Sequence, residues 1–586
     1  MGPSLRRDDK NARKRPITMK RGMRKGLTSY GDQEFSLFLR KTFIKAMGYS
    51  DDALDRPIVA ITNTYSDFNP CHGNVPDLIE AAKRGVMLAG GLPMVFPTIT
   101  IHESFAYPTS MFLRNLMAMD TEEMIRAQPM DSVILIGGCD KTLPAQIMAA
   151  ASVDLPAITL PVGPMVVGHH KGEVLGACTD CRRMWSSHRA GDIDGDEIEI
   201  INARLAPSVG TCMVMGTAST MACITEAMGL SLPYTAAVPA THAERRRLAE
   251  ATGKRAAEMA VSDTPRPSAL ITKDSIHNAL VVLQSIGGST NGIVHLAAMA
   301  GRVGIKIDLD AFDRLGRDVP VLVNLKPSGQ HYMEHFHHAG GLPRLMRELR
   351  DLLKLDAPVV GGGTIGDVIE LAEDVPGQDV IRRRDKPLKA QGAIAVLRGN
   401  LAPRGAVIKQ SAASKELMVH TGRAVVFESV QDLTERVDAP DLDVKADDIL
   451  VLRNAGPKGA PGMPEAGYLP IPKKLAREGV KDMVRISDAR MSGTAFGTIV
   501  LHITPESAIG GPLALVQNGD MIRLDVPNRA IELLVDDAEL ARRAEALPVL
   551  TGTGPKRGYA KLFQDTVLQA DQGCDFDFLI EDPRAN

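Results

Sequence analysis

Between residues 57 and 300, short apolar runs alternate with stretches whose apolar residues recur at helical spacing. "PIVAITN" from residue 57 and "DSVILIGG" from residue 131 are typical of strands that are buried on both faces. Between them, "NVPDLIEAAKRGVMLAGG" from residue 74 has the helical period and stops at Gly-Gly. This alternation of strand and helix predicts an α/β fold built on a doubly wound parallel sheet.

Further elements follow the same alternation. "LPMVFPTIT" from residue 92 and "LPAITLPVG" from residue 155 are predicted strands, and "LPAQIMAAASV" from residue 143 is a predicted helix. Another helix is expected to begin at Thr121, which has the chemistry of an N-cap. In such a sheet the functional residues lie on loops at the carboxyl ends of the strands.

The pattern changes near residue 385, where "RRRDKPLKAQG" forms a polar segment with Pro and Gly. Seven short β-type runs follow, separated by Gly, Pro and Asn turns: "AIAVLRGN", "RAVVFES", "DILVLRN", "DMVRIS", "GTIVLHI", "DMIRLDV" and "IELLV". We therefore expect an α/β domain over residues 27–384 and a β-rich domain, a barrel or a sandwich, over residues 385–586.

The first 26 residues are basic and lack the apolar stretch of a secretory signal, so we expect a disordered or surface-lying tail. A nucleic-acid-binding arm is the alternative. The formal net charge is -3 and aromatic residues make up only 4% of the chain, which argues against a nucleic-acid partner. No apolar run reaches the roughly 18 residues of a membrane span, so no membrane partner is expected.

Seven cysteines are scattered along the chain, an odd number without an export signal. A disulfide framework is therefore not expected, and a reducing cytoplasm is the predicted location. In that setting, thiols that come together in the fold suggest a metal site or catalysis.

Three of these cysteines lie in turn-like contexts before predicted helices: Cys71 in "NPCHGN", Cys139 in "GGCDKT" and Cys212 in "GTCMVMG". Helix N-termini stabilise thiolates and the sulfurs of a cluster. Three thiolates would leave one iron of an iron–sulfur cluster with an open position, where it can act as a Lewis acid. Spacing alone leaves a second interpretation open, that of small buried residues in tight turns.

A second set of candidates carries oxygen ligands. Asp140 follows Cys139 directly, Glu103 lies in "TIHESF", and Glu465 lies in the Gly- and Pro-rich "GPKGAPGMPEAG". Carboxylates on such loops suit Mg²⁺, although solvated surface acids remain the alternative. Ser492 in "ISDARMSGTAFG" has the setting of an exposed base or nucleophile, or of a helix cap.

"CTDC" at residues 178–181 has the spacing of a redox pair or of half a zinc site. No second C-x-x-C occurs in the chain, so a structural zinc site would need distant partners.

From about residue 27 to about residue 580, the chain resembles the dihydroxy-acid dehydratase / 6-phosphogluconate dehydratase family, and within it the sugar-acid dehydratases. The resemblance rests on motifs in family order: "NPCHGN", "QPMDSVILIGGCDKTLPA", "GTCMVMGTASTMA", "IGGSTN", "LKPSG", "LRGNLAPRGAV", "GPKGAPGMPE" and "ISDARMSGTAFG". It implies an α/β first domain, a β-barrel-like second domain, and an active site between them.

The resemblance also implies the chemistry, which is removal of water from a 2,3-dihydroxy acid to give a 2-keto-3-deoxy acid. By the matching positions, a [2Fe-2S] cluster is expected on the three cysteines of the turns, and Mg²⁺ on three carboxylates and a carbamylated lysine. Ser492 would take the C2 proton, and Thr494 would touch the substrate. The positions implied are Cys71, Cys139 and Cys212 for the cluster, and Glu103, Asp140, Glu465 and Lys141 for the metal.

The stretch "TIHESFAYPTSMFLRN" resembles the sugar-acid branch, so the expected substrate is an aldonate, a pentonate such as arabinonate or xylonate. Hexonates and fuconate stay open. The alternatives are a dihydroxy-acid dehydratase of branched-chain amino-acid biosynthesis and, remotely, a non-catalytic iron–sulfur or thiol redox sensor. The resemblance implies a homodimer or homotetramer and assigns no role to Cys178, Cys181, Cys223 or Cys574.

Overall fold

A parallel four-stranded sheet organises the first half of the chain in the computed structural model, which describes residues 21–27, 30–547 and 554–580. The strand order is β2-β1-β3-β4, and all three strand pairs are parallel. The strands are β1 (Ile58–Asn63), β2 (Leu92–Pro97), β3 (Ser132–Gly137) and β4 (Ala157–Pro161). They coincide with the four apolar runs, and this part of the prediction is confirmed.

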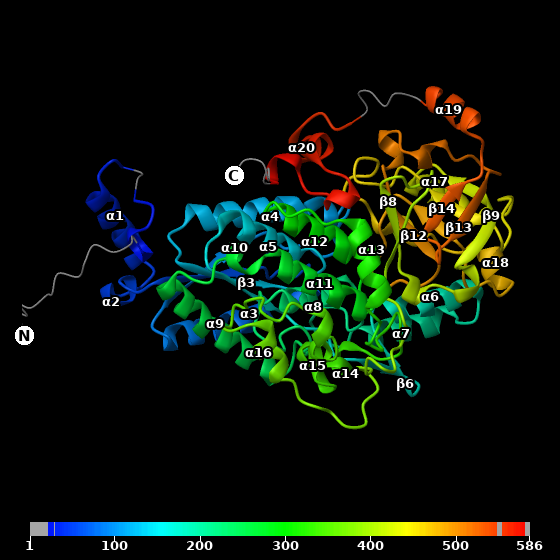
Figure 1. The fold of residues 1–586 in the computed structure, drawn as a ribbon. Helices are drawn as coiled ribbons and strands as arrows, with labels where there is room; N and C mark the ends of the chain where they lie inside the picture. The colour runs from blue at the N-terminus through cyan, green and yellow to red at the C-terminus, as the bar shows by residue number, and fades with distance from the viewer. Residues whose placement is uncertain (1–20, 28–29, 548–553, 581–586) are drawn as a thin grey trace, which may run out of the picture.

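Helices cover both faces of this sheet. Figure 1 shows α4 (Ser110–Ala127) and α5 (Thr142–Val153) on one face, and α3 (Val75–Leu88) and α9 (Ala243–Ser262) on the other. The helix predicted to begin at Thr121 is wrong in its start, because α4 begins eleven residues earlier at Ser110. Thr121 is buried in the middle of that helix and caps nothing.

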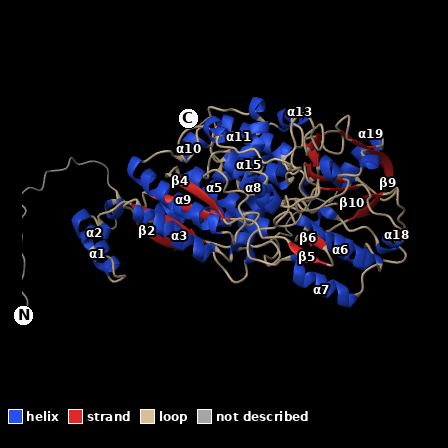
Figure 2. Ribbon diagram, turned by 90° about the horizontal axis from the view of Figure 1, so that it is seen from below, coloured by secondary structure: helices blue, strands red, loops and turns tan. Residues whose placement is uncertain are grey.

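The remaining helices of the first half enlarge the core around the sheet. Figure 2 shows a separate group formed by α6, α7 and the hairpin of β5 (Gly168–His170) with β6 (Glu173–Leu175). The helices are α1 (Gln33–Lys45), α2 (Asp51–Leu54), α6 (Thr179–Ala190), α7 (Gly195–Leu205), α8 (Thr217–Ala227), α10 (Pro267–Leu270), α11 (Lys273–Ser285), α12 (Asn291–Gly301), α13 (Leu309–Asp318), α14 (Met333–His338), α15 (Gly341–Glu348) and α16 (Ile365–Glu370).

An eight-stranded sheet forms most of the second half, in the order β14-β13-β9-β10-β11-β12-β8-β7. The strands are β7 (Ala395–Leu397), β8 (Gly405–Ile408), β9 (Val419–Phe427), β10 (Ile449–Leu452), β11 (Arg485–Ser487), β12 (Ile499–Thr504), β13 (Met521–Asp525) and β14 (Ala530–Leu533). Short helices accompany it: α17 (Val430–Arg436), α18 (Lys473–Arg477), α19 (Asp537–Glu545) and α20 (Gly558–Thr566). All seven predicted β-type runs are strands, and only β8 was not foreseen.

The two edges of this sheet meet. Arg398, which follows β7, accepts a hydrogen bond from the N–H of Ile531 in β14 at 2.8 Å and donates to the carbonyl of Arg529 at 2.9 Å. The sheet is therefore nearly closed, and the four neighbours β9, β10, β11 and β12 run parallel within it. Of the two predicted alternatives, a sandwich would need two packed sheets, whereas the second half has one nearly closed eight-stranded sheet.

The end of the chain returns to the first half. Arg302, at the C-cap of α12, forms a fully buried ion pair with Asp575 at 2.6 Å. Phe112 on α4 packs against Tyr559 and Phe563 on α20. These contacts add to the core that joins the two halves. No helix within the described ranges is both long enough and apolar enough to cross a membrane.

Residues 1–20 of the predicted basic tail lie outside the described residues. Residues 21–26 pack on the body: Met23 is buried, the N–H of Gly22 donates to the carboxylate of Asp131, and Arg40 donates to the carbonyls of Met23 and Lys25.

Candidate active site

The loops after β1 and β3 carry the first candidate residues, and the strand order explains why they meet. β1 and β3 are neighbours at the centre of the sheet. The chain leaves β1 toward β2 on one side and leaves β3 toward β4 on the other, so the two loops start side by side at the carboxyl ends and turn in opposite directions. Such a switch point is where open α/β sheets bind ligands. Cys71 lies in the 3-10 turn Pro70–His72 after β1, and the trio Cys139, Asp140 and Lys141 follows β3 directly.

His72 fixes these two loops to each other. Its Nε2 accepts the N–H groups of Gly138 at 3.1 Å and Cys139 at 3.2 Å. Because Nε2 accepts, the proton is on Nδ1, which donates to the carbonyl of Thr64 at 2.9 Å. Burial lowers the pKa of His72 to about 4, so the ring stays neutral. These hydrogen bonds hold Cys139 beside Cys71.

The thiols form two pairs in this region. The Sγ atoms of Cys71 and Cys139 and a ring nitrogen of His102 lie within 4.8 Å of one another. Cys212, on the loop before α8, has its Sγ 3.1 Å from the Sγ of Cys178. The hydrogen bond with Cys139 and burial raise the pKa of Cys71 well above its usual range, and the bond with Cys178 and burial do the same for Cys212.

The carboxylates form the other half of the site. Oxygens of Glu103, Asp140 and Glu465 lie within 4.8 Å of one another. Glu103 is on the loop after β2, whereas Glu465 begins the 3-10 turn Glu465–Tyr468 of the second half. The two halves of the chain therefore complete this cluster together.

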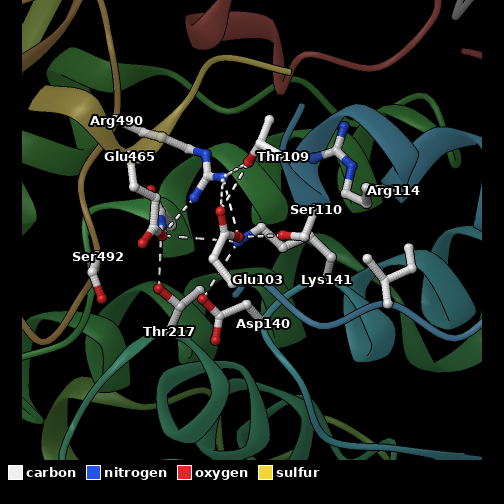
Figure 3. A network of polar contacts seen from close by, with 12 residues as sticks. Glu103, Thr109, Ser110, Arg114, Asp140, Lys141, Thr217, Glu465, Arg490 and Ser492 are labelled. Carbon is white, nitrogen blue, oxygen red and sulfur yellow. Dashed lines mark hydrogen bonds and ion pairs between the residues drawn. The ribbon is translucent and has the colours of Figure 1, made fainter. Parts of the chain in front are cut away.

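Two buried cations balance the three acids (Figure 3). Lys141 Nζ lies 2.7 Å from Glu103, 3.4 Å from Asp140 and 3.9 Å from Glu465. Arg490 lies 2.6 Å from Glu465 and 3.1 Å from Glu103. Both cations are only 1% exposed, so water screens these interactions little.

The cations act unequally on the two glutamates. Burial alone would raise the pKa of Glu103, but Arg490 and Lys141 hold it well below its usual range. Burial and the charge of Glu103 raise the pKa of Glu465. Glu103 is further fixed by Thr109, whose hydroxyl donates to it at 2.8 Å, and by Ser110.

Ser492 lies on the loop after β11, beside the carboxylate network in Figure 3. Its Oγ is 2.8 Å from Oγ1 of Thr494. Residue 493 must be glycine here, because a Cβ would meet Ser289 at 2.5 Å and the N–H nitrogen of Thr217 at 2.8 Å. The loop therefore packs against α8 and the start of α12.

Side chains from three other elements hold the backbone around Ser492. Asn291 donates to the carbonyl of Met491 at 3.1 Å. Lys409 donates to the carbonyl of Gly493 at 3.1 Å, and Thr179 donates to that of Thr494 at 3.0 Å. The backbone around the Ser492 hydroxyl is thus held at three of the four residues from Met491 to Thr494, which preorganises this hydroxyl.

The structure thus brings together all the residues that the sequence singled out for the site. Sequence reasoning missed His102, Arg490 and the pair Thr217 and Asn291, whose side chains lie 3.2 Å apart. It singled out Cys178 only as a partner of Cys181, whereas the structure pairs Cys178 with Cys212. Arg490, Thr217 and Asn291 lie inside motifs that were already recognised, and His102 precedes Glu103. Their partners are distant in sequence, so pattern alone gave them no role.

The donor chemistry of the two halves fits two kinds of metal. Three carboxylate oxygens within 4.8 Å fit one octahedral Mg²⁺, whose opposite ligands are roughly 4.2 Å apart. The two thiol pairs together offer four sulfurs, the number that an iron–sulfur cluster usually takes.

Two family models together match most of the chain. Residues 56–368 match the N-terminal domain of the dihydroxy-acid/6-phosphogluconate dehydratase family, and residues 379–574 match its C-terminal domain. The chain is 50% identical over 552 residues to the "Putative dehydratase IlvD1" of Rhizobium meliloti (strain 1021), which covers 94% of this chain and 96% of the relative.

Two further relatives have more specific names. The chain is 48% identical over 556 residues to the "L-arabinonate dehydratase" of Rhizobium leguminosarum bv. trifolii (strain WSM2304), covering 94% of this chain and 95% of the relative. It is 45% identical over 535 residues to the "6-deoxy-6-sulfo-D-gluconate dehydratase" of Pseudomonas putida, covering 90% of this chain and 91% of the relative.

Proposed function

Because the chain belongs to the dihydroxy-acid/6-phosphogluconate dehydratase family and is a dehydratase of its sugar-acid branch, we propose that it converts a pentonate to the 2-keto-3-deoxy acid. The observation that carries this proposal is the site itself. Glu103, Asp140 and Glu465 converge beside two thiol pairs, with the hydroxyl of Ser492 at the margin.

The proposed cofactors follow from the donors. Cys71, Cys139 and Cys212 would hold a [2Fe-2S] cluster, and Glu103, Asp140 and Glu465 would hold Mg²⁺. When bound, the magnesium ion would stabilise negative charge on the substrate's carboxylate and C2 oxygen, and the open iron would help the C3 hydroxyl to leave.

Lys141 has a role on the carboxylate side. Its ammonium is held among three acids and, with Arg490, supplies the positive charge between them. Carbamylation of Nζ would reverse that charge and supply a further oxygen ligand. Mg²⁺ would then supply the positive charge among the acids, and the modified lysine would be one of its ligands.

The protein's own groups would perform the proton transfer. Ser492 Oγ, as an alkoxide, would take the proton from C2. Passing this proton to the hydroxide that leaves C3 would release one water and restore the alkoxide. An alkoxide requires a depressed pKa, which nearby positive charge provides. Thr494 is 2.8 Å from Ser492 Oγ and is placed to donate a hydrogen bond to that oxygen or to the substrate. The enol product then tautomerises to the keto acid.

The proposed substrate is a pentonate because the chain is 48% identical to a protein named for L-arabinonate. A hexonate is the second candidate, because a relative at 45% identity is named for a sulfo-gluconate. A branched-chain dihydroxy acid is a third candidate, while a redox sensor would leave Ser492 and the acids without use. We further propose a cytoplasmic homodimer or homotetramer with no nucleic-acid or membrane partner.

The test is a substrate panel. The protein, loaded anaerobically with iron and sulfide and supplied with Mg²⁺, is assayed for 2-keto acid with pentonates, hexonates, fuconate and 2,3-dihydroxyisovalerate. The proposal expects the highest kcat/KM with one pentonate. A higher value with the branched dihydroxy acid would overturn the substrate class, and no 2-keto acid from any of these substrates would overturn the proposed activity.

A further inference from the structure

Cys178 places a fourth thiol in the site. It immediately precedes α6, and its Sγ lies 3.1 Å from that of Cys212. The thiols of Cys71 and Cys139 form the other pair. The site therefore holds two pairs of thiols, whereas the proposed cluster uses three cysteines.

Neighbouring contacts fix the position of Cys178. The next residue, Thr179, donates to the carbonyl of Thr494 at 3.0 Å, on the loop of the proposed base. Asp180 is buried and accepts hydrogen bonds from Lys326 Nζ and from the hydroxyl of Tyr332, both at 2.8 Å. Cys178 thus lies on a segment that is tied to both halves of the molecule, as a preorganised ligand must be.

The separation of the two sulfurs distinguishes two roles. A disulfide requires about 2.05 Å between sulfurs. Two thiolates on one tetrahedral metal, with bonds of roughly 2.3 Å, lie roughly 3.8 Å apart. The observed 3.1 Å is closer to the metal-bound separation, so Cys178 and Cys212 need to move apart by less than an ångström to share an iron.

Cys181 provides the contrast within the same C-x-x-C segment. It packs, partly buried, against the apolar cluster of Leu175, Met184, Ile201 and Leu205. Burial raises the pKa of its thiol to about 12. Cys181 therefore serves packing, and it is a matched control for Cys178.

We propose that Cys178 is a fourth thiolate ligand of the iron–sulfur cluster, bound to the iron that Cys212 holds, when no substrate is present. This inference rests on the proposed cluster. Two thiolates on each iron complete the usual four-cysteine coordination. The resting cluster would then be closed to oxidants, and the substrate hydroxyl would have to take the place of Cys178.

The test compares wild type with Cys178→Ala and Cys181→Ala after anaerobic reconstitution. All three proteins should contain about two irons per chain. Cys178→Ala should shift the visible maxima and the electron paramagnetic resonance g values of the reduced cluster, and it should lose its colour faster in air. Cys181→Ala should match wild type in both respects. Far-ultraviolet circular dichroism confirms that the variants are folded.

The outcomes separate this inference from the proposed function. If wild type takes up iron and sulfide but Cys178→Ala has the same spectra and the same rate of bleaching, Cys178 is not a ligand and the proposed function stands. If wild type takes up no cluster, both fail. If Cys178 and Cys212 are found joined as a disulfide by peptide mass spectrometry in the iron-loaded wild type, the ligand assignment is overturned.

Discussion

Cys139 and Asp140 are neighbours on one loop, yet they belong to two sides of the site, a thiol side and a carboxylate side, that differ in charge. On the carboxylate side, Lys141 and Arg490 already balance three acids inside the protein. On the thiol side, burial and the thiol–thiol hydrogen bonds raise the pKa values of Cys71 and Cys212, so these groups remain neutral. The carboxylate side is charged and paired before any metal binds, whereas Cys71 and Cys212 on the thiol side keep their protons.

This difference has consequences for assembly. A metal that enters the carboxylate half must displace or convert internal cations, whereas a metal that enters the thiol half must displace protons. Removing a carboxylate therefore disturbs a balance of charges in the folded protein. Removing a thiol leaves the folded protein nearly unchanged and alters only what it can bind.

The largest expected effect comes from replacing Cys139 and Asp140 one at a time, which tests the thiol side and the carboxylate side separately. Cys139→Ser should abolish uptake of iron and all turnover, because Cys139 is one of the three cysteines proposed to hold the cluster. Asp140→Asn should keep about two irons per chain and weaken Mg²⁺ binding by at least ~10-fold. Iron analysis and Mg²⁺ titration measure both. Loss of iron in the Asp140 variant would show that the two halves are not separable.

The next largest effect concerns the base. Ser492→Ala should lower kcat by ~10²–10⁴-fold and change KM less, because the substrate is held by other groups. Iron content and Mg²⁺ binding should equal those of wild type, since Ser492 belongs to neither half. Exchange of the C2 proton with deuterated solvent is the decisive measurement. Exchange at the wild-type rate in this variant would exclude Ser492 as the base.

The place of Cys139, Asp140 and Lys141 could be predicted from the sequence, because they follow the strong apolar run of β3, whereas the full ligand set came from the resemblance to the dehydratase family. β1 and β3 are largely apolar strands; Cys139 comes two residues after β3, and Cys71 lies on the loop that follows β1. The helical start at Ser110 was missed because "SMFLRNLMAMD" mixes polar and apolar residues without a clear face, and tertiary burial decides it instead. β8 was missed because it is four residues long and follows a Gly- and Pro-rich turn.

The missing site residues show a second limit. Arg490 matters because Glu103, 387 positions earlier, lies against it, and Cys178 matters because Cys212 does. A C-x-x-C spacing draws attention to the pairing of Cys178 with Cys181, whereas the fold pairs Cys178 with a cysteine on another loop. Long-range pairing of single residues leaves no periodic signal in one sequence.

A smaller effect tests the internal cations. Arg490→Met leaves Glu465 and Glu103 with Lys141 alone, and breaking a buried pair of this kind costs about 3–5 kcal/mol of stability. Thermal unfolding should show a lower Tm, and Mg²⁺ should raise the Tm of the variant more than that of wild type.

Arg404→Met is the control for this change. Arg404 pairs with Asp571 but is 41% exposed, so its loss should cost ~0–1 kcal/mol. Equal losses of stability in the two variants would mean that Arg490 does not balance the acids. A Tm of the Arg490 variant that Mg²⁺ leaves unchanged would contradict the proposed magnesium site.

The smallest expected effect is a difference in pH dependence between the halves. Cys71 and Cys212 have raised pKa values, so each must release a proton when a metal binds, and this release becomes harder as the pH falls. Glu103, held well below its usual pKa, is already ionised at neutral pH, and the raised pKa of Glu465 makes it the glutamate of this pair that regains a proton more readily. Between about pH 8.5 and 6.5, Co²⁺ binding to the metal-free protein should therefore weaken more steeply than Mg²⁺ binding.

Calorimetry in buffers of different ionisation enthalpy counts the protons released with each metal. Equal proton release for Co²⁺ and Mg²⁺ would mean that the thiols were already ionised, and the contrast between the two halves would be lost.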